Sequence, residues 1–139
     1  MEMKIHTTNY QNGFIEIADD CPVGFGQVPP TKGDKKSIAN YQFEMVKENP
    51  YKYDSDEVLF TVFAIRKEIN ETEWEAERQQ FFSKGQPCFR ASPLTQRYGW
   101  GVHCDEHGKM AIYGAETPAY QKFLADQSIK KIKAMKSKR

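Results

Sequence analysis

Hydrophobic and polar positions alternate in some parts of this chain and recur at helical spacing in others. Residues 14–18 place Ile15 and Ile17 on one face and a glutamate on the other, which predicts a half-buried strand. Residues 57–67 form a nearly continuous apolar run rich in β-branched and aromatic side chains. Such a run predicts a strand that is covered on both faces and lies centrally in a sheet.

A polar turn joins two further apolar segments near the C-terminal third of the chain. Residues 100–104 and 109–113 flank a four-residue polar loop, Asp105 to Gly108, with glycine where a positive φ is useful. The pattern predicts a β-hairpin over residues 100–113.

Helical spacing predicts three longer helices and one short turn. Residues 37–49 carry apolar side chains at helical spacing up to Pro50, and residues 71–83 follow Asn70 in a sequence similar to a capping box. Ser92-Pro93 and Thr117-Pro118 each pair a capping hydroxyl with a proline suited to the first helical position. They predict a short turn that ends at Gly99 and a third helix. Three later apolar residues continue a helical stripe towards the C-terminus: Ile129, Ile132 and Met135.

These elements predict one mixed α+β domain over residues 1–139. About four strands, including the hairpin, pack with three or four helices, and their order is not the strict alternation of a doubly wound sheet. Residues 19–36 are rich in proline and glycine and predict a long irregular loop. Loops of this length within compact domains are often functional.

The chain has a net charge of +1 and a basic C-terminal tail at about residues 128–139. Residues 130–139 hold six Lys or Arg and no acid, so the rest of the chain carries −5. The tail suits either attraction of nucleic acid and other acidic partners or simple solvation. No apolar stretch is long enough for a bilayer, no secretory pattern opens the chain, and three widely spaced cysteines favour a reducing compartment. We expect a cytoplasmic protein that does not enter a membrane.

Residues 90–100 offer the most suggestive binding chemistry. Arg90, Ser92, Arg97 and Trp100 could clamp a carboxylate or phosphate and stack a planar group. The alternative is structural, because the arginines can pair with glutamates and the tryptophan can fill the core.

A second candidate anion site precedes the first predicted helix. Lys32, Lys35 and Lys36 lie beside Gly33 and Ser37, where free backbone amides of a helix N-terminus favour anions. The spacing is not that of a Walker A loop, and an ordinary solvated loop explains the same residues. We expect no cofactor.

The hairpin tip and the cysteines offer a different chemistry. His103, Cys104, Asp105 and His107 can each bind metals, but adjacent strand residues point to opposite faces and no established ligand spacing is present. We therefore expect no metal site. Cys21, at the start of the long loop, is the more plausible exposed thiol, whereas a packed position is expected for Cys88.

Three runs of the sequence resemble a family of small bacterial proteins of unknown function, about 140 residues long. They are Pro29 to Lys36, Asn49 to Tyr53 and, above all, Ser83 to Gly101 with its Arg-Tyr-Gly-Trp-Gly end. The resemblance implies a bacterial, single-domain, cytosolic protein and no activity. A weaker likeness, to α+β domains of the YjbR type, rests on residues 57–60 and the tryptophan-led hairpin, and implies a possible DNA binder.

Two classes of function follow. The first is a cytosolic binding module in which Arg90, Arg97 and Trp100 recognise an anionic small molecule or a nucleic acid, with the basic tail adding attraction. The second is a small enzyme or sensor whose pocket lies between the 19–36 loop and the 100–113 hairpin, with Cys21 or His103 reactive. No catalytic spacing decides between them.

Overall fold

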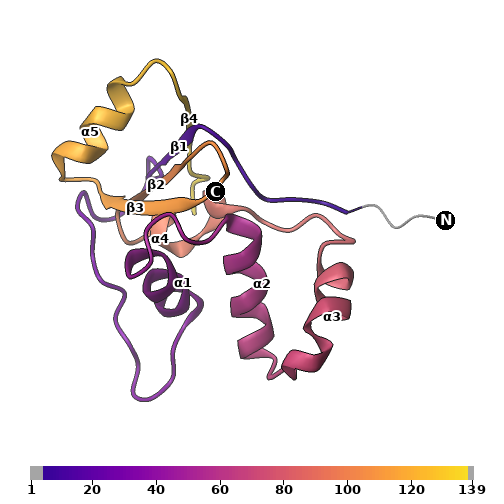
Figure 1. The fold of residues 1–139 in the computed structure, drawn as a ribbon. Coiled ribbons are helices and arrows are strands. Elements are labelled where there is room, and N and C mark those ends of the chain that lie inside the picture. The colour runs from indigo at the N-terminus through magenta and orange to yellow at the C-terminus, as the bar shows by residue number, and fades with distance from the viewer. Residues whose placement is uncertain (1–4, 138–139) are drawn as a thin grey trace.

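The computed structural model describes residues 5–137, which form one α+β domain around a mixed sheet (Figure 1). The strands are β1 (Gly13–Glu16), β2 (Trp100–Cys104), β3 (Met110–Gly114) and β4 (Lys130–Lys133). Their order across the sheet is β3-β2-β1-β4, with β2 antiparallel to both neighbours and β4 parallel to β1. The expected α+β class, four-stranded sheet and hairpin are confirmed.

Helices cover both faces of this sheet (Figure 1). They are α1 (Ile38–Lys47), α2 (Ser55–Arg66), α3 (Trp74–Phe81), α4 (Pro93–Gln96) and α5 (Pro118–Ala125), with 3₁₀ turns η1 (Glu71–Glu73) and η2 (Phe89–Ala91). α1, α2 and α4 pack on one face, α5 packs on the other, and α3 lies outside α2. No helix within residues 5–137 is long and apolar enough to cross a bilayer.

The predicted helix starts are set by side-chain caps. The Ser37 hydroxyl accepts the Asn40 N–H, and the Asn40 amide oxygen accepts the Ser37 N–H in return. The hydroxyls of Ser92 and Thr117 cap α4 and α5 by accepting the N–H of Leu94 and Tyr120, and each is followed by proline. These caps fix where the three helices begin, as their sequences predict.

Strand β1 is buried on both faces rather than on one. Ile15 faces α1 and α2, whereas Phe14 packs against the Tyr120 and Phe123 rings of α5, at centroid distances of 4.9 and 5.1 Å. Phe14 and Ile15 are 0% and 1% exposed. The first predicted strand therefore exists, but it is an inner strand of the sheet rather than a half-buried one.

The predicted central strand at residues 57–67 is wrong, because this segment is the helix α2. Asp54 caps it, with its carboxylate accepting the Glu57 N–H at 2.8 Å. Val58 and Val62 face the main core, whereas Phe60 and Ala64 face a second apolar cluster under α3. A helix buried on two sides has no polar face, so its sequence reads as a continuous apolar run.

The expected helical stripe over Ile129, Ile132 and Met135 is also wrong. Residues 130–133 form β4, which pairs in parallel with β1 and puts Lys130 opposite Gly13. Ala134 is buried and its N–H donates to the Glu16 carbonyl. The described part of the basic tail thus contains an edge strand, and Lys138 and Arg139 lie outside the described residues.

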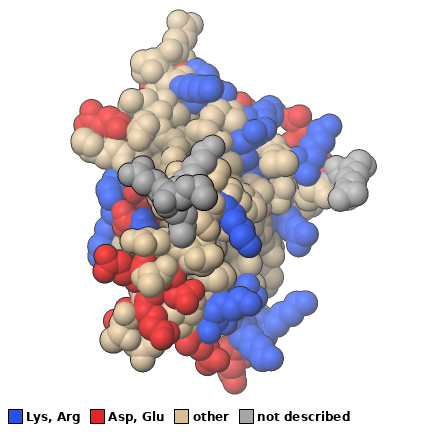
Figure 2. Space-filling view, turned by 90° about the vertical axis from the view of Figure 1, so that its right-hand side faces the viewer, with Lys and Arg blue, Asp and Glu red and all other residues tan. Residues whose placement is uncertain are grey.

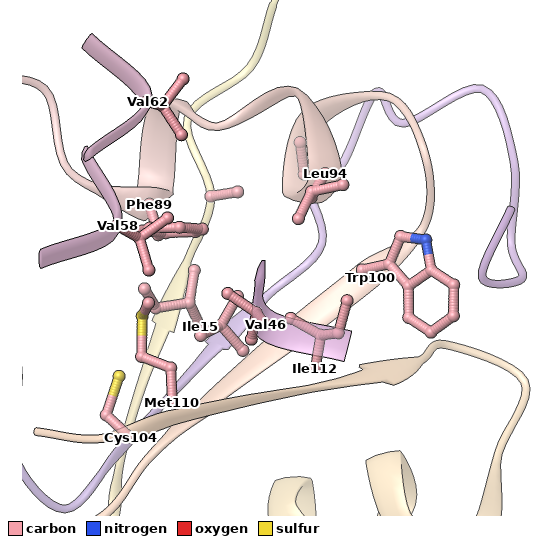
Figure 3. Packing of buried hydrophobic residues seen from close by; sticks show 13 residues of the cluster. Ile15, Val46, Val58, Val62, Phe89, Leu94, Trp100, Cys104, Met110 and Ile112 are labelled. Carbon is pink, nitrogen blue, oxygen red and sulfur yellow. The ribbon is translucent and has the colours of Figure 1, made fainter. Parts of the chain in front are cut away.

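One apolar core holds the sheet to α1, α2 and α4. Figure 3 shows Ile15, Val46, Val58 and Met110 pointing towards one another, with Leu94 above them on α4. Each of these five side chains is at most 1% exposed. Burying side chains of this size contributes ~1.5–3 kcal/mol each, which makes this cluster the main source of stability.

The long loop at residues 19–36 is irregular, as predicted, and is held to the start of β2. The Gln27 N–H donates to the Tyr98 carbonyl, and the Trp100 indole N–H donates to the Gln27 carbonyl, both at 2.8 Å. Gly99, between these partners, has a φ of +75°, and a side chain there would overlap the Phe25 carbonyl. The loop therefore docks where only glycine fits.

Candidate functional site

A cavity of about 280 Å³ opens between the helices on one side of the sheet. We call it the helical cavity; its walls come from α1, α2, α3 and residues 86–93. The lining side chains are Ile38, Gln42, Leu59, Val62, Phe63, Arg66, Phe81, Gln86, Pro87, Cys88, Ala91, Ser92 and Pro93. Most of them are apolar, as in small-molecule sites generally.

Two polar side chains in the wall of the helical cavity are joined by a hydrogen bond. The Ser92 hydroxyl donates to the Gln42 amide oxygen at 2.6 Å and also accepts the Leu94 N–H. Ser92 is 3% exposed and Gln42 is 2% exposed. This pair fixes the start of α4 against α1 and gives the cavity a rigid polar spot.

Cys88 is half-buried and lines the same cavity. Its sulfur accepts the Arg90 N–H at 3.4 Å and lies 3.4 Å from the Tyr10 hydroxyl. Burial, together with the hydrogen bond to Cys88, raises the pKa of Tyr10 to about 12. Tyr10 is therefore a neutral phenol at physiological pH, able to donate to the thiol.

Arg66 brings the one cationic side chain among the lining residues. It lies in the last turn of α2 and is exposed, and its side chain makes no hydrogen bond or ion pair within the 5–137 range. No sequence pattern selects Arg66, because the run that contains it reads as a strand.

The structure does not gather the predicted set at residues 90–100 around one point. The Arg90 guanidinium donates through Nε to the Lys133 carbonyl at 2.8 Å, whereas Arg97 is exposed at the end of α4. Trp100 is 7% exposed and packs in the core beside Phe43. Of the predicted residues, only Ser92 lines the helical cavity.

The three lysines of the other predicted anion site lie on the exposed loop that leads into α1. Lys32 and Lys35 form an isolated bridge with each other through their backbones. The Lys36 ammonium pairs with Glu44 at 2.9 Å, and this pairing raises the Lys36 pKa. The loop ends at Ser37, directly before Ile38, the α1 residue at the edge of the helical cavity.

A second hollow, of about 460 Å³, lies along the outer edge of β3. We call it the edge groove. Its lining residues are Gly26, Val46, Lys47, Pro50, Trp100, Ala111, Ile112, Tyr113, Gly114, Glu116 and Thr117. The groove thus lies between one residue of the long loop, the end of α1 and the hairpin.

The candidate metal ligands of the hairpin diverge. Cys104 points into the core, where burial raises its pKa to about 12, and His103 points to the opposite face, towards α5. His107 is exposed and lies 3.4 Å from Glu106. Within residues 5–137 no three His, Cys, Asp or Glu side chains come close enough to hold an ion.

His103 instead ends a chain of hydrogen bonds that the sequence did not reveal. The Tyr51 hydroxyl lies 2.8 Å from His103 Nδ1 and 2.9 Å from the Tyr113 hydroxyl. The imidazole stacks on the Phe123 ring, with 4.2 Å between the two ring centroids. Burial lowers the pKa of His103 and raises that of Tyr51, so both are neutral near pH 7. Tyr51 has a φ of +60°, which no local pattern predicts.

Charge is unevenly distributed over the surface. On the face that carries α3, acidic side chains gather mostly at the lower left and basic ones along the right (Figure 2). In the described part of the tail, Lys133 pairs with Asp19 at 2.5 Å and the Lys131 ammonium donates to the Asp126 carbonyl. Part of the basic charge of β4 is therefore used within the fold.

Comparison with known proteins identifies a family and no activity. The model of the DUF6157 family, a family of unknown function, matches residues 5–139. No curated protein and no solved structure matches the chain significantly. Neither the bacterial origin nor the likeness to YjbR-type domains is tested by these comparisons, and both stay predictions.

Proposed function

Because this chain belongs to the DUF6157 family, whose function is unknown, we propose a function from its own geometry. It is a binding module for a small molecule that has an apolar body and one anionic group, held in the helical cavity. The observation that carries this proposal is a mostly apolar cavity with a single unpaired cation, Arg66, among its lining residues.

The size and lining of the cavity favour a small ligand. Its volume of about 280 Å³ lies just below the usual range of ~300–1,000 Å³ for ligand sites. Leu59, Val62 and Phe63 offer one apolar wall, so a compact alkyl or aromatic body gains free energy by leaving water. The Gln42 amide oxygen is already satisfied by the Ser92 hydroxyl and needs no donor from the ligand.

The charge of the ligand follows from Arg66. A guanidinium presents paired N–H donors that match a carboxylate or phosphate, and no side chain in the described part of the chain occupies them. The exposed loop that ends beside the same cavity adds a small net positive charge, because Lys32 and Lys35 outnumber Asp34, whereas Lys36 is paired with Glu44. An anionic group at the mouth therefore suits both elements.

A nucleic acid is the less favoured ligand. Lys131 and Lys133 of the tail make intramolecular contacts, and Arg90 bonds to the backbone of β4. These contacts leave fewer free cations for phosphates, whose neutralisation dominates nucleic-acid affinity.

A small enzyme that uses the edge groove is a second candidate. Tyr113 lines that groove, and its hydroxyl connects through Tyr51 to His103. This chain of hydrogen bonds, from the groove wall to a neutral imidazole, favours the candidate, because histidine is the side chain that most often serves in acid–base catalysis.

We further propose a cytoplasmic location. Cys21, Cys88 and Cys104 are all free thiols, and Cys104 is buried where oxidation would disturb the core. A reducing compartment keeps such thiols intact.

Competition binding tests the proposed ligand class. Anilinonaphthalene sulfonate, which joins an apolar body to an anion, should bind with saturable fluorescence, and octanoate should displace it more strongly than octanol. Arg66→Gln should weaken octanoate about threefold, as expected for a partly exposed ion pair, and leave octanol unchanged. Arg97→Gln, an exposed arginine outside the cavity, is the matched control.

A second variant fills the site. Leu59→Trp places a larger side chain in the cavity wall and should abolish dye binding while circular dichroism stays unchanged. Equal displacement by octanoate and octanol would overturn the anionic ligand, and unaltered dye binding in the folded Leu59→Trp variant would overturn the cavity. Binding of an oligonucleotide without binding of octanoate would favour the nucleic-acid alternative.

A further inference from the structure

The side-chain amide of Gln42 is hydrogen-bonded at only one of its two ends. Its oxygen accepts the Ser92 hydroxyl at 2.6 Å, and that hydroxyl in turn accepts the Leu94 N–H. Its nitrogen, Nε2, makes no hydrogen bond to any residue in the 5–137 range. The amide oxygen therefore has a structural role, whereas the two N–H donors of Nε2 have none.

The free donor of Gln42 can be reached from the helical cavity. The side chain is 2% exposed and lines the cavity from α1. Among the described residues, no side-chain nitrogen or oxygen is both sealed off and without a hydrogen-bond partner. The small surface that Gln42 retains therefore includes Nε2, and an oxygen atom the size of a water molecule can contact it.

A donor in these surroundings disfavours a ligand that is purely hydrocarbon along its body. The nearby wall of Leu59, Val62 and Phe63 is apolar, so it offers no acceptor of its own. A ligand that fills the cavity excludes water from Nε2, and an alkyl chain puts no acceptor in the place of that water. A carbonyl oxygen does, and it brings no donor that would need a partner in turn.

The amide and the guanidinium contact different parts of a ligand. The residues that α2 presents to the cavity lie at the spacing of one helix face: Leu59, Val62, Phe63 and Arg66. Seven residues of α-helix span about 10 Å, so this face is long enough for a short alkyl chain. Gln42 is buried and Arg66 is exposed. The amide therefore meets the body of the ligand and the guanidinium meets its end.

We propose that the ligand of the helical cavity is an oxo acid, a short alkyl chain with a carbonyl group along its length and a carboxylate at its end. Gln42 donates from Nε2 to the carbonyl oxygen, and Arg66 pairs with the carboxylate. This inference rests on the function proposed above and narrows its ligand class, because an apolar body with an anion alone leaves the Gln42 donor unused.

Isomers of oxooctanoate test this class. The isomers have the same charge, length and polarity, and they differ only in the carbon atom that bears the carbonyl oxygen. In competition with anilinonaphthalene sulfonate, one isomer or two neighbouring ones should bind about fivefold more tightly than the others, as expected for one added hydrogen bond. Equal affinities of all the isomers would overturn the inference.

Substitution of the donor tests the role of Gln42. Gln42→Met removes Nε2 with little change in side-chain size, so it should abolish the preference among isomers while octanoate still binds. Gln79→Met is the matched control, because this exposed glutamine of α3 lies outside the cavity, and it should keep the preference. An isomer preference that survives in a folded Gln42→Met variant would overturn the role of Gln42.

A measurement on the unaltered protein does not depend on the folding of any variant. In nuclear magnetic resonance spectra, the preferred isomer should move the side-chain amide protons of Gln42 further downfield than octanoate does, because these protons gain an acceptor. Identical positions with both ligands would show that the carbonyl does not reach Nε2 and would overturn the contact.

The outcomes separate this inference from the function on which it rests. If neither octanoate nor any oxo acid displaces the dye, the function proposed for the helical cavity is wrong, and the oxo-acid class is wrong with it. If octanoate displaces the dye but no isomer is preferred, only the oxo-acid class is wrong.

Discussion

The Tyr51 hydroxyl lies 2.8 Å from Nδ1 of His103 and joins it to Tyr113, across 52 residues of sequence. Tyr51 reaches this position from a backbone of positive φ that is anchored by the Met110 carbonyl. A left-handed conformation costs a tyrosine ~1–2 kcal/mol, so the surrounding contacts must offset it. The connection between α1 and α2 is therefore held firmly against the hairpin.

Tyr51→Phe should destabilise the fold by about 1–2 kcal/mol, because it removes the hydroxyl that bridges the other two groups. Chemical denaturation measures the loss. Tyr53→Phe is the matched control, since the Tyr53 hydroxyl makes no hydrogen bond within residues 5–137, and it should change stability little. Equal effects of the two substitutions would contradict a stabilising role for the bridge.

His103 should titrate below about 6.5, the ordinary pKa of histidine. Burial lowers its pKa, while the carboxylates of Asp105 and Asp126 oppose this effect; Tyr51 and Phe123 bring no charge. The unfolded chain then binds the proton more readily than the folded one. Stability should accordingly fall as the pH is lowered from about 6.5 to the folded pKa, and stay level with respect to this group outside that window.

Proton resonances of the imidazole give the titration directly, and denaturation at several pH values gives the stability. The His103→Gln variant should lose this part of the pH dependence. A His103 titration midpoint at or above about pH 6.5 would contradict this prediction, because it would show that the two carboxylates raise the pKa by at least as much as burial lowers it.

The parts of the fold that could be predicted are those with local causes. The hairpin follows from a polar four-residue loop, and α1, α4 and α5 follow from the caps Ser37, Ser92 and Thr117. These features depend on neighbours within four residues. Sequence patterns record them well.

The wrong predictions concern elements whose structure depends on segments that are distant in the sequence. Phe60 and Ala64 of α2 are apolar because α3 covers them, and without α3 their run is indistinguishable from a buried strand. β4 exists because Lys130 pairs with Gly13, a contact across most of the chain. The sequence did not reveal the helical cavity for the same reason, since Arg66 and Ser92 line one cavity only in the folded chain.

Because the long loop docks onto β2, we expect alanine substitutions at two glycines to lower stability by different amounts. Gly99 and Gly33 both have positive φ, at +75° and +63°, but only Gly99 faces the Phe25 carbonyl, whereas Gly33 faces open space. Gly33→Ala should cost ~1 kcal/mol from backbone strain alone. Gly99→Ala must also displace the loop and should cost ~3 kcal/mol or more. Similar melting temperatures for the two variants would contradict the docking.

Truncation tests whether the C-terminal segment is part of the fold. A chain that ends at Ser128 loses β4, its ladder with β1 and the buried Ala134. It also leaves the Arg90 side chain without the Lys133 carbonyl. The melting temperature should fall by more than about 10 °C, as expected when several hydrogen bonds and an apolar contact are removed together.

A chain that ends at Met135 is the control, because it keeps β4 and, among the described residues, loses exposed contacts such as those of Ser137 with Asp20. It should melt within about 3 °C of the full chain, since exposed hydrogen bonds contribute little. If the chain ending at Ser128 melts equally high, the basic segment is an appendage and its lysines are free for an acidic partner. A large loss confined to the shorter chain instead assigns β4 a structural role, because the lysines then lie on an edge strand that the sheet requires.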